Sequence, residues 1–170
     1  SGQINAVNEY NQKVQLNFSN LKTDGATEMT SFNERIGKQK VSLEKLAIGV
    51  EGKELALLEG MNIDGKSTLT EDGKGINSQL DYTVNSLKLQ NKDLGSGRLT
   101  VKLDNLDGQA WHQFSQQYNS EAQALMAKPE LAQNPELYQQ ALTETFFKAL
   151  PVLLKGNPSL TIAPLSWRNA

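Results

Sequence analysis

Few residues of this 170-residue chain have the chemistry and the spacing that catalysis needs. His112 is the only histidine and there is no cysteine. A serine–histidine triad, a thiolate nucleophile, a multi-histidine metal site and a disulfide are therefore excluded. His112 lies beside Trp111 in a segment of helical periodicity, where we expect a partly exposed helix residue. We assign it no catalytic role.

Carboxylate and glycine motifs add no candidate active site. Glu71 and Asp72 fall in a predicted turn, where solvated carboxylates are normal, so a glycosidase-like acid pair is unsupported. The stretches "GKG" (73–75) and "GSG" (95–97) lack the third glycine of a dinucleotide fingerprint, and we interpret both as hairpin turns. The stretch "LDNLDG" (103–108) has leucine where a calcium loop needs an oxygen ligand. We expect no catalytic residue, no cofactor and no metal.

Large apolar side chains form the one candidate binding surface. Aromatic residues recur at helical spacing between residues 111 and 118, a pattern that is more typical of a helix core than of a ligand platform. The alternative is an apolar groove, which would exist if the helices stand off the sheet. The candidate groove residues are Trp111, Phe114, Tyr118, Phe146, Leu150 and Trp167.

The composition excludes other classes of partner. The net charge is −2 with both signs evenly spread, and only three arginines are present. A nucleic-acid footprint would need clustered Lys and Arg, so we expect no nucleic-acid binding. The longest apolar run, "LPVLL" at 150–154, is far too short to span a membrane.

The chain divides into three regions of different hydrophobic periodicity, and the elements they form must position these residues. Residues 12–107 show period-two patterns between turn signals, which indicates antiparallel strands. Residues 108–156 switch to helical periodicity, and residues 157–170 return to strand. We therefore predict a single α+β domain, with strands over 1–107, a two- to three-helix insert and a C-terminal strand. The turn signals are "TDG" at 23–25, "EG" at 51–52, "DG" at 64–65 and 72–73, and "GSG" at 95–97.

One pattern, apolar–x–apolar–x–x–Leu, occurs four times in the strand region. Its first two apolar positions share one sheet face, and a bend at the two following polar residues would return the leucine to that face. We thus predict long, bent strands of weakly repeated design, with one apolar face and buried final leucines. The motifs are "LNFSNL" (16–21), "VSLEKL" (41–46), "YTVNSL" (82–87) and "VKLDNL" (101–106), ending at Leu21, Leu46, Leu87 and Leu106.

The helical insert is expected to cover that apolar face. Asp107 is the predicted cap of the first helix, and Asn134 caps a second helix with Pro135 in its first turn. Pro151 should kink the second helix, and Gly156 should end it.

The sequence of the final segment, residues 157–170, predicts one more strand of the sheet. Leu160 and Ile162 alternate with a threonine and should lie on the apolar face, while Pro164 marks a strand end or an edge. Trp167 should fold back onto the apolar surface near the helices. An unpaired edge at this position would favour self-association.

Two stretches resemble the YdgA family of proteobacterial envelope proteins. They are "AWHQFSQQYN" (110–119) and "NPSLTIAPLSW" (157–167), and the similarity extends over about residues 80–170. The resemblance implies a longer, periplasmic parent protein with an N-terminal inner-membrane anchor, and an internal or C-terminal-half position for this chain. Ala170 would then be an experimental boundary, and membrane contact would be made only by that anchor. The resemblance implies no catalytic residues.

Three classes of function remain. We favour a non-catalytic structural or interaction module of the cell envelope, whose partner is a second copy or another envelope protein. The alternative is a module that binds or shields a lipid or fatty acid on the apolar face. An enzyme is the weakest hypothesis.

Overall fold

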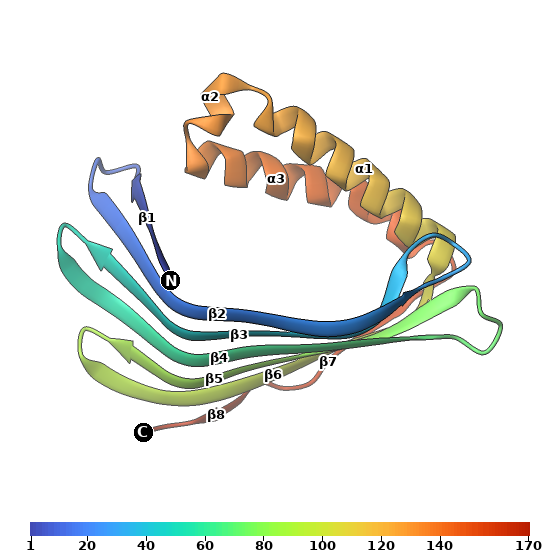
Figure 1. The fold of residues 1–170 in the computed structure, drawn as a ribbon, viewed down its shortest axis with the longest axis horizontal. Helices are drawn as coiled ribbons and strands as arrows, with labels where there is room; N and C mark the ends of the chain where they lie inside the picture. The colour runs from blue at the N-terminus through green and yellow to red at the C-terminus, as the bar shows by residue number, and fades with distance from the viewer.

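The computed structural model describes residues 1–170 and consists of one antiparallel β-sheet with helices on one side (Figure 1). This arrangement confirms the predicted α+β class and the helical insert. The strands are β1 (Gly2–Val7), β2 (Lys13–Met29), β3 (Arg35–Val50), β4 (Lys53–Leu69), β5 (Gly75–Leu89), β6 (Lys92–Asp107), β7 (Ser159–Ile162) and β8 (Ser166–Arg168). The helices are α1 (Gly108–Met126), α2 (Pro129–Ala132), α3 (Pro135–Ala149) and the 3-10 helix η1 (Leu150–Leu154).

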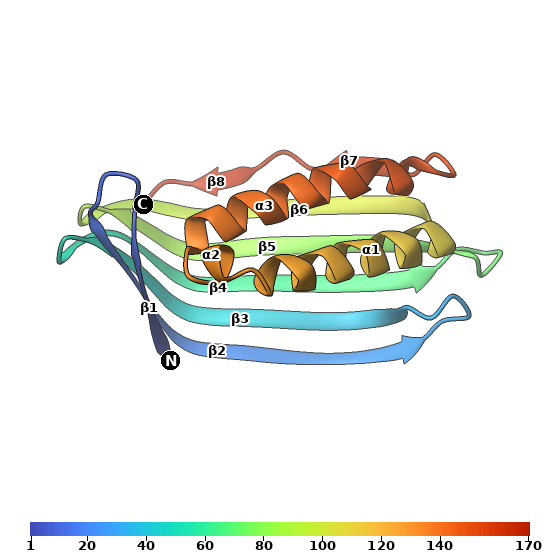
Figure 2. The ribbon, with the colours of Figure 1, turned by 90° about the horizontal axis from the view of Figure 1, so that it is seen from above.

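The strand order in the sheet follows the order along the chain from β1 to β7 (Figure 2). β7 and β8 both pair with β6, one after the other along its free side. Leu160 and Ile162 of β7 pair with Leu103 and Val101 of β6, so the predicted final strand is confirmed. Pro164 lies between the two short strands, where it interrupts no ladder.

Three of the predicted turns are wrong. "TDG" at 23–25 lies inside β2, "DG" at 64–65 inside β4, and "GSG" at 95–97 inside β6. Asp64 and Gly65 pair with β3 on one side and β5 on the other, and Thr23 to Gly25 pair with β3. This long-range pairing overrides the local preference of Asp–Gly for a turn. The "EG" and "DG" turns at 51–52 and 72–73 are confirmed.

The predicted bend in the strands is present and crosses the sheet (Figure 1). Asn20 in β2 and Gly60 in β4 have left-handed φ values of 55° and 63° at corresponding points. Such a residue turns the strand and changes the alternation of its side chains, so Leu58 and Met61 face the same side although they lie three residues apart. Glycine adopts this conformation without a Cβ penalty, and asparagine tolerates it.

The core is small and lies at one end of the sheet. Phe32, Ile36, Ile76 and Leu106 form a buried cluster, against which α1 and η1 contribute Trp111 and Leu153. Only 12 of the 170 residues are buried, so the helices cover one end of the apolar face and leave the rest open.

This partial cover corrects the prediction of four buried leucines. Leu106 is buried, with 3% of its surface exposed, because it lies beneath the helices. Leu21 is 53% exposed, and Leu46 and Leu87 are half-buried, because no helix packs on their part of the sheet.

The helix ends follow the sequence closely. The Asp107 side chain accepts from the Ala110 amide at 2.9 Å, and the Asn134 side chain accepts from the Leu137 amide at 3.2 Å. Both are side-chain caps that satisfy amides of the first turn. Pro151 was expected to kink α3; instead α3 ends at Ala149, and the chain continues as the 3-10 helix η1.

Candidate apolar binding face

The sheet face on the helix side carries rows of apolar side chains that remain exposed to solvent. Residues paired across strands point to the same face, so the register defines the rows. This face is also concave, since the far end of the sheet curls toward the helices (Figure 1). We call it the open face; its rows are Phe18, Leu46, Leu58 and Leu87; Leu21, Leu43 and Met61; and Thr23, Val41, Ile63, Tyr82 and Leu99.

The open face contains no charged side chain, whereas the opposite face is densely charged. Ile63 and Tyr82, near the middle of the open face, are each 37% exposed. The rows of the opposite face include Ser19, Lys45, Glu59 and Ser86, and Asp24, Lys40, Asp64, Asp81 and Thr100. A folded chain normally hides a continuous apolar surface of this kind, so its exposure makes the open face the candidate binding surface.

An apolar cavity of about 240 Å³ lies on the open face beside β8. Trp167 forms one wall and is fixed by a hydrogen bond from its Nε1 to the Leu94 carbonyl, at 2.8 Å. Its ring lies over Gly97, where an added Cβ would be 2.3 Å from the ring. The apolar lining residues are Leu58, Met61, Ile63, Tyr82, Val84, Leu99, Leu165 and Trp167.

The predicted groove residues separate into two groups. Trp111, Phe114 and Tyr118 of α1 stack with centroid separations of 5.6 and 6.1 Å, and Phe146 of α3 meets Phe114 edge-on at 5.7 Å. Phe114 is only 5% exposed, so this cluster holds the helical hairpin together. Leu150 begins η1 and is half-buried.

Trp167 lies apart from that cluster, in the cavity of the open face. The other lining residues were not identified from the sequence. β4 keeps the spacing of the repeated motif at Ala56, Leu58 and Met61, with Gly60 at the bend, but methionine stands where the motif has its final leucine, so the repeat was not recognised.

His112 joins the first helix to the sheet. Its Nδ1 lies 2.9 Å from Oε1 of Glu34, a residue of the loop between β2 and β3. The His112 side chain is 30% exposed. The two residues are 78 positions apart, and no local pattern indicates their contact. The arrangement is an inter-element polar contact with no nucleophile in it.

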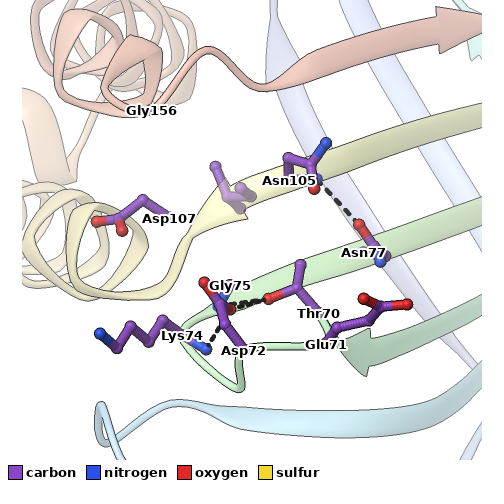
Figure 3. Close-up of a pocket in the computed structure, with 10 residues that line it drawn as sticks. Thr70, Glu71, Asp72, Lys74, Gly75, Asn77, Asn105, Asp107 and Gly156 are labelled. Carbon is purple, nitrogen blue, oxygen red and sulfur yellow. Dashed lines mark hydrogen bonds between the residues drawn. The ribbon is translucent and has the colours of Figure 1, made fainter.

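A polar depression of about 600 Å³ lies at the turn between β4 and β5 (Figure 3). Asp72 accepts from the Thr70 hydroxyl at 2.7 Å and from the Lys74 amide at 2.9 Å. These bonds, that of Thr70 above all, lower the pKa of the Asp72 carboxyl. Its carboxylate is thus satisfied within the turn itself, as expected for a turn aspartate.

The structure contains no group of three or more His, Asp or Glu side chains placed to hold a metal ion. None of its helices combines the length and the apolar character needed to cross a membrane.

Comparison with known proteins gives one family and two curated relatives. The family described as "Bacterial protein of unknown function (DUF945)" matches residues 1–170. The chain is 69% identical over 170 residues to "Protein YdgA" of Escherichia coli (strain K12), covering all of this chain and 34% of that protein. It is 29% identical over 136 residues to "Uncharacterized protein YihF" of the same organism, covering 79% of this chain and 28% of that protein. The chain therefore spans about a third of the length of these relatives, and no solved structure matches it.

Proposed function

This chain belongs to the DUF945 family of bacterial proteins, whose description specifies no activity, so we propose its function from its own geometry. It is a non-catalytic binding module of the bacterial cell envelope that holds an apolar partner on the open face. The observation that carries the proposal is the exposure of three successive rows of uncharged side chains on one face of the sheet.

The total exposed area supports the proposal. The chain exposes 11640 Å², whereas a compact monomer of 18.7 kDa would expose about 8,300 Å². Standard protein interfaces bury about 800 Å² per partner. The surplus is several times larger, which fits a surface that is covered when the protein works.

The non-catalytic part of the proposal draws on the polar side chains. The one histidine contacts Glu34 between α1 and the sheet, and Asp72 is satisfied within its own turn. The proposed envelope location, with a parent anchored in the inner membrane and the rest in the periplasm, draws on the resemblance of the two stretches described above.

The proposal is tested with a matched pair of charge substitutions in β3. Val41 points to the open face, and the adjacent Ser42 points to the opposite face. Val41→Glu places a carboxylate among the apolar rows and should weaken binding of ANS, an aromatic sulfonate dye, by about tenfold, because the carboxylate must be desolvated and repels the sulfonate. Ser42→Glu adds the same charge on the opposite face and should leave dye binding unchanged.

Fluorescence titration of the folded proteins measures both effects, with circular dichroism as the check on folding. If the unmodified chain does not bind the dye, or if the two variants behave alike, the open face is not a binding surface.

A further inference from the structure

The occupant of the open face follows from the chemistry of the cavity beside β8. Resting on the function proposed above, we infer that this cavity holds the hydrocarbon chain of a fatty acid or lipid, with Met61 in its floor and Trp167 as its fixed wall.

The cavity offers little to a polar ligand beyond the Tyr82 hydroxyl. Arg98 borders it, but its guanidinium extends to the opposite face, where Nη2 lies 3.3 Å from Asp81 Oδ1. The Trp167 N–H already donates to the Leu94 carbonyl. Six of the eight apolar lining residues are aliphatic or methionine, and Tyr82 and Trp167 are the other two. A saturated chain, which needs no hydrogen bond, is complementary to this uncharged lining.

The size of the cavity fits part of a chain-like ligand. Its volume of about 240 Å³ is below the roughly 300–1,000 Å³ of sites that enclose drug-sized ligands, so it would hold a segment of a hydrocarbon chain while the rest lies along the open face. An α-helix, about 10 Å across with its side chains, is too wide for it. An extended peptide lying on the face would find no backbone partners, because the sheet's own amides and carbonyls are paired between strands.

The wall of the cavity is built into the fold. Gly97 has no side chain, and the Trp167 ring occupies the space that a Cβ would take. Leu165, on the approach to β8, is 62% exposed at the rim of the cavity. The last strand thus forms one side of the site, with the sheet as its floor.

The test uses cis-parinaric acid as a fluorescent probe and palmitate as the competitor. We expect the unmodified chain to bind the probe and palmitate to displace it. Met61→Glu should weaken palmitate binding by about tenfold or more, because the buried carboxylate would lose its hydration and would repel the palmitate carboxylate. Ser42→Glu is the matched control: it adds the same charge on the opposite face of the sheet, outside the cavity lining, and should change the affinity less than about twofold.

A second variant protects the test against misfolding of Met61→Glu. Leu165→Glu changes an exposed rim residue and should also weaken palmitate binding while leaving the circular dichroism spectrum unchanged. In a Trp111→Phe background, the emission of Trp167 should shift when palmitate is added.

The outcomes separate this inference from the proposed function. ANS binding that depends on Val41, without any binding of parinaric acid or palmitate, would overturn the acyl-chain site and leave the open face as a binding surface. A dimer in sedimentation velocity that Met61→Glu dissociates, again without fatty-acid binding, would identify a second copy as the occupant and also overturn the inference. Loss of both dye and fatty-acid binding would overturn both proposals.

Discussion

At the scale of single residues, Asp81 is the centre of a hydrogen-bond network on the opposite face of the sheet. Its carboxylate accepts from Thr100 at 2.5 Å, from Gln79 at 3.0 Å and from Arg98 at 3.3 Å. These three donors come from β5 and β6 and hold the charged form in place. The hydrogen bond from Thr100 is the largest cause of a lowered pKa for the Asp81 carboxyl, followed by that from Gln79.

The lowered pKa predicts how stability depends on pH. The folded pKa lies below the ordinary value of 3.8, so the carboxylate stabilises the fold above that value, and the contribution is lost as pH falls through the folded pKa. Asp81→Asn should therefore be less stable than the unmodified chain at neutral pH. The difference should disappear in acid below the folded pKa.

Urea unfolding at several pH values measures this difference. Asp24→Asn is the control, since it removes a carboxylate of the same face whose hydrogen bond comes from the amide of the next residue, Gly25, at 2.9 Å. An Asp81→Asn deficit that stays constant down to strong acid would contradict the assignment.

At the scale of elements, the bend is what places the repeated leucines on one face. Left-handed residues stand directly before three of these apolar side chains, and each returns its successor to the apolar face: Asn20 before Leu21, Gly60 before Met61 and Asn105 before Leu106. Their burial depends on a second factor, the position of the helices. Leu106 lies beneath α1 and η1, whereas Leu21 lies on the open face.

This difference predicts unequal effects of the same truncation. Leu106→Ala should lower the free energy of unfolding by about 2–5 kcal/mol, because it leaves a cavity in the core cluster. Leu21→Ala should lower it by about 0.5 kcal/mol or less, because that side chain is already 53% exposed. Urea melts of the two variants decide the matter, and equal losses would contradict the partial cover.

The sequence predicted the helical insert, its two caps, the final strand and the bend, because each has a local signal. It did not predict strand lengths or the cavity. Asp–Gly at 64–65 has the local chemistry of a turn, yet neighbours on both sides hold it extended. The cavity joins Leu58 to Trp167, and only the register of strands distant in sequence brings such residues together.

At the scale of the whole molecule, the helical hairpin is fixed to the sheet at one end. Phe32 of the β2–β3 loop packs on Gly108, and His112 contacts Glu34 of the same loop. From there α1 rises away from the sheet, and α2 lies at the end farthest from it (Figure 1). The apolar area that a central core would bury is therefore divided between a small core and an exposed face.

The agreement between strand order and chain order has a kinetic consequence. Each of β2 to β6 pairs with its immediate predecessor in the chain, so every pairing step closes only a short loop and meets an edge that already exists. A chain emerging from its N-terminus could assemble this sheet strand by strand, without waiting for its C-terminal residues. Pulsed hydrogen exchange during refolding should therefore show amides of the β2–β3 hairpin protected no later than those pairing β6 with β7. Earlier protection of the β6–β7 amides would indicate that folding begins at the helices.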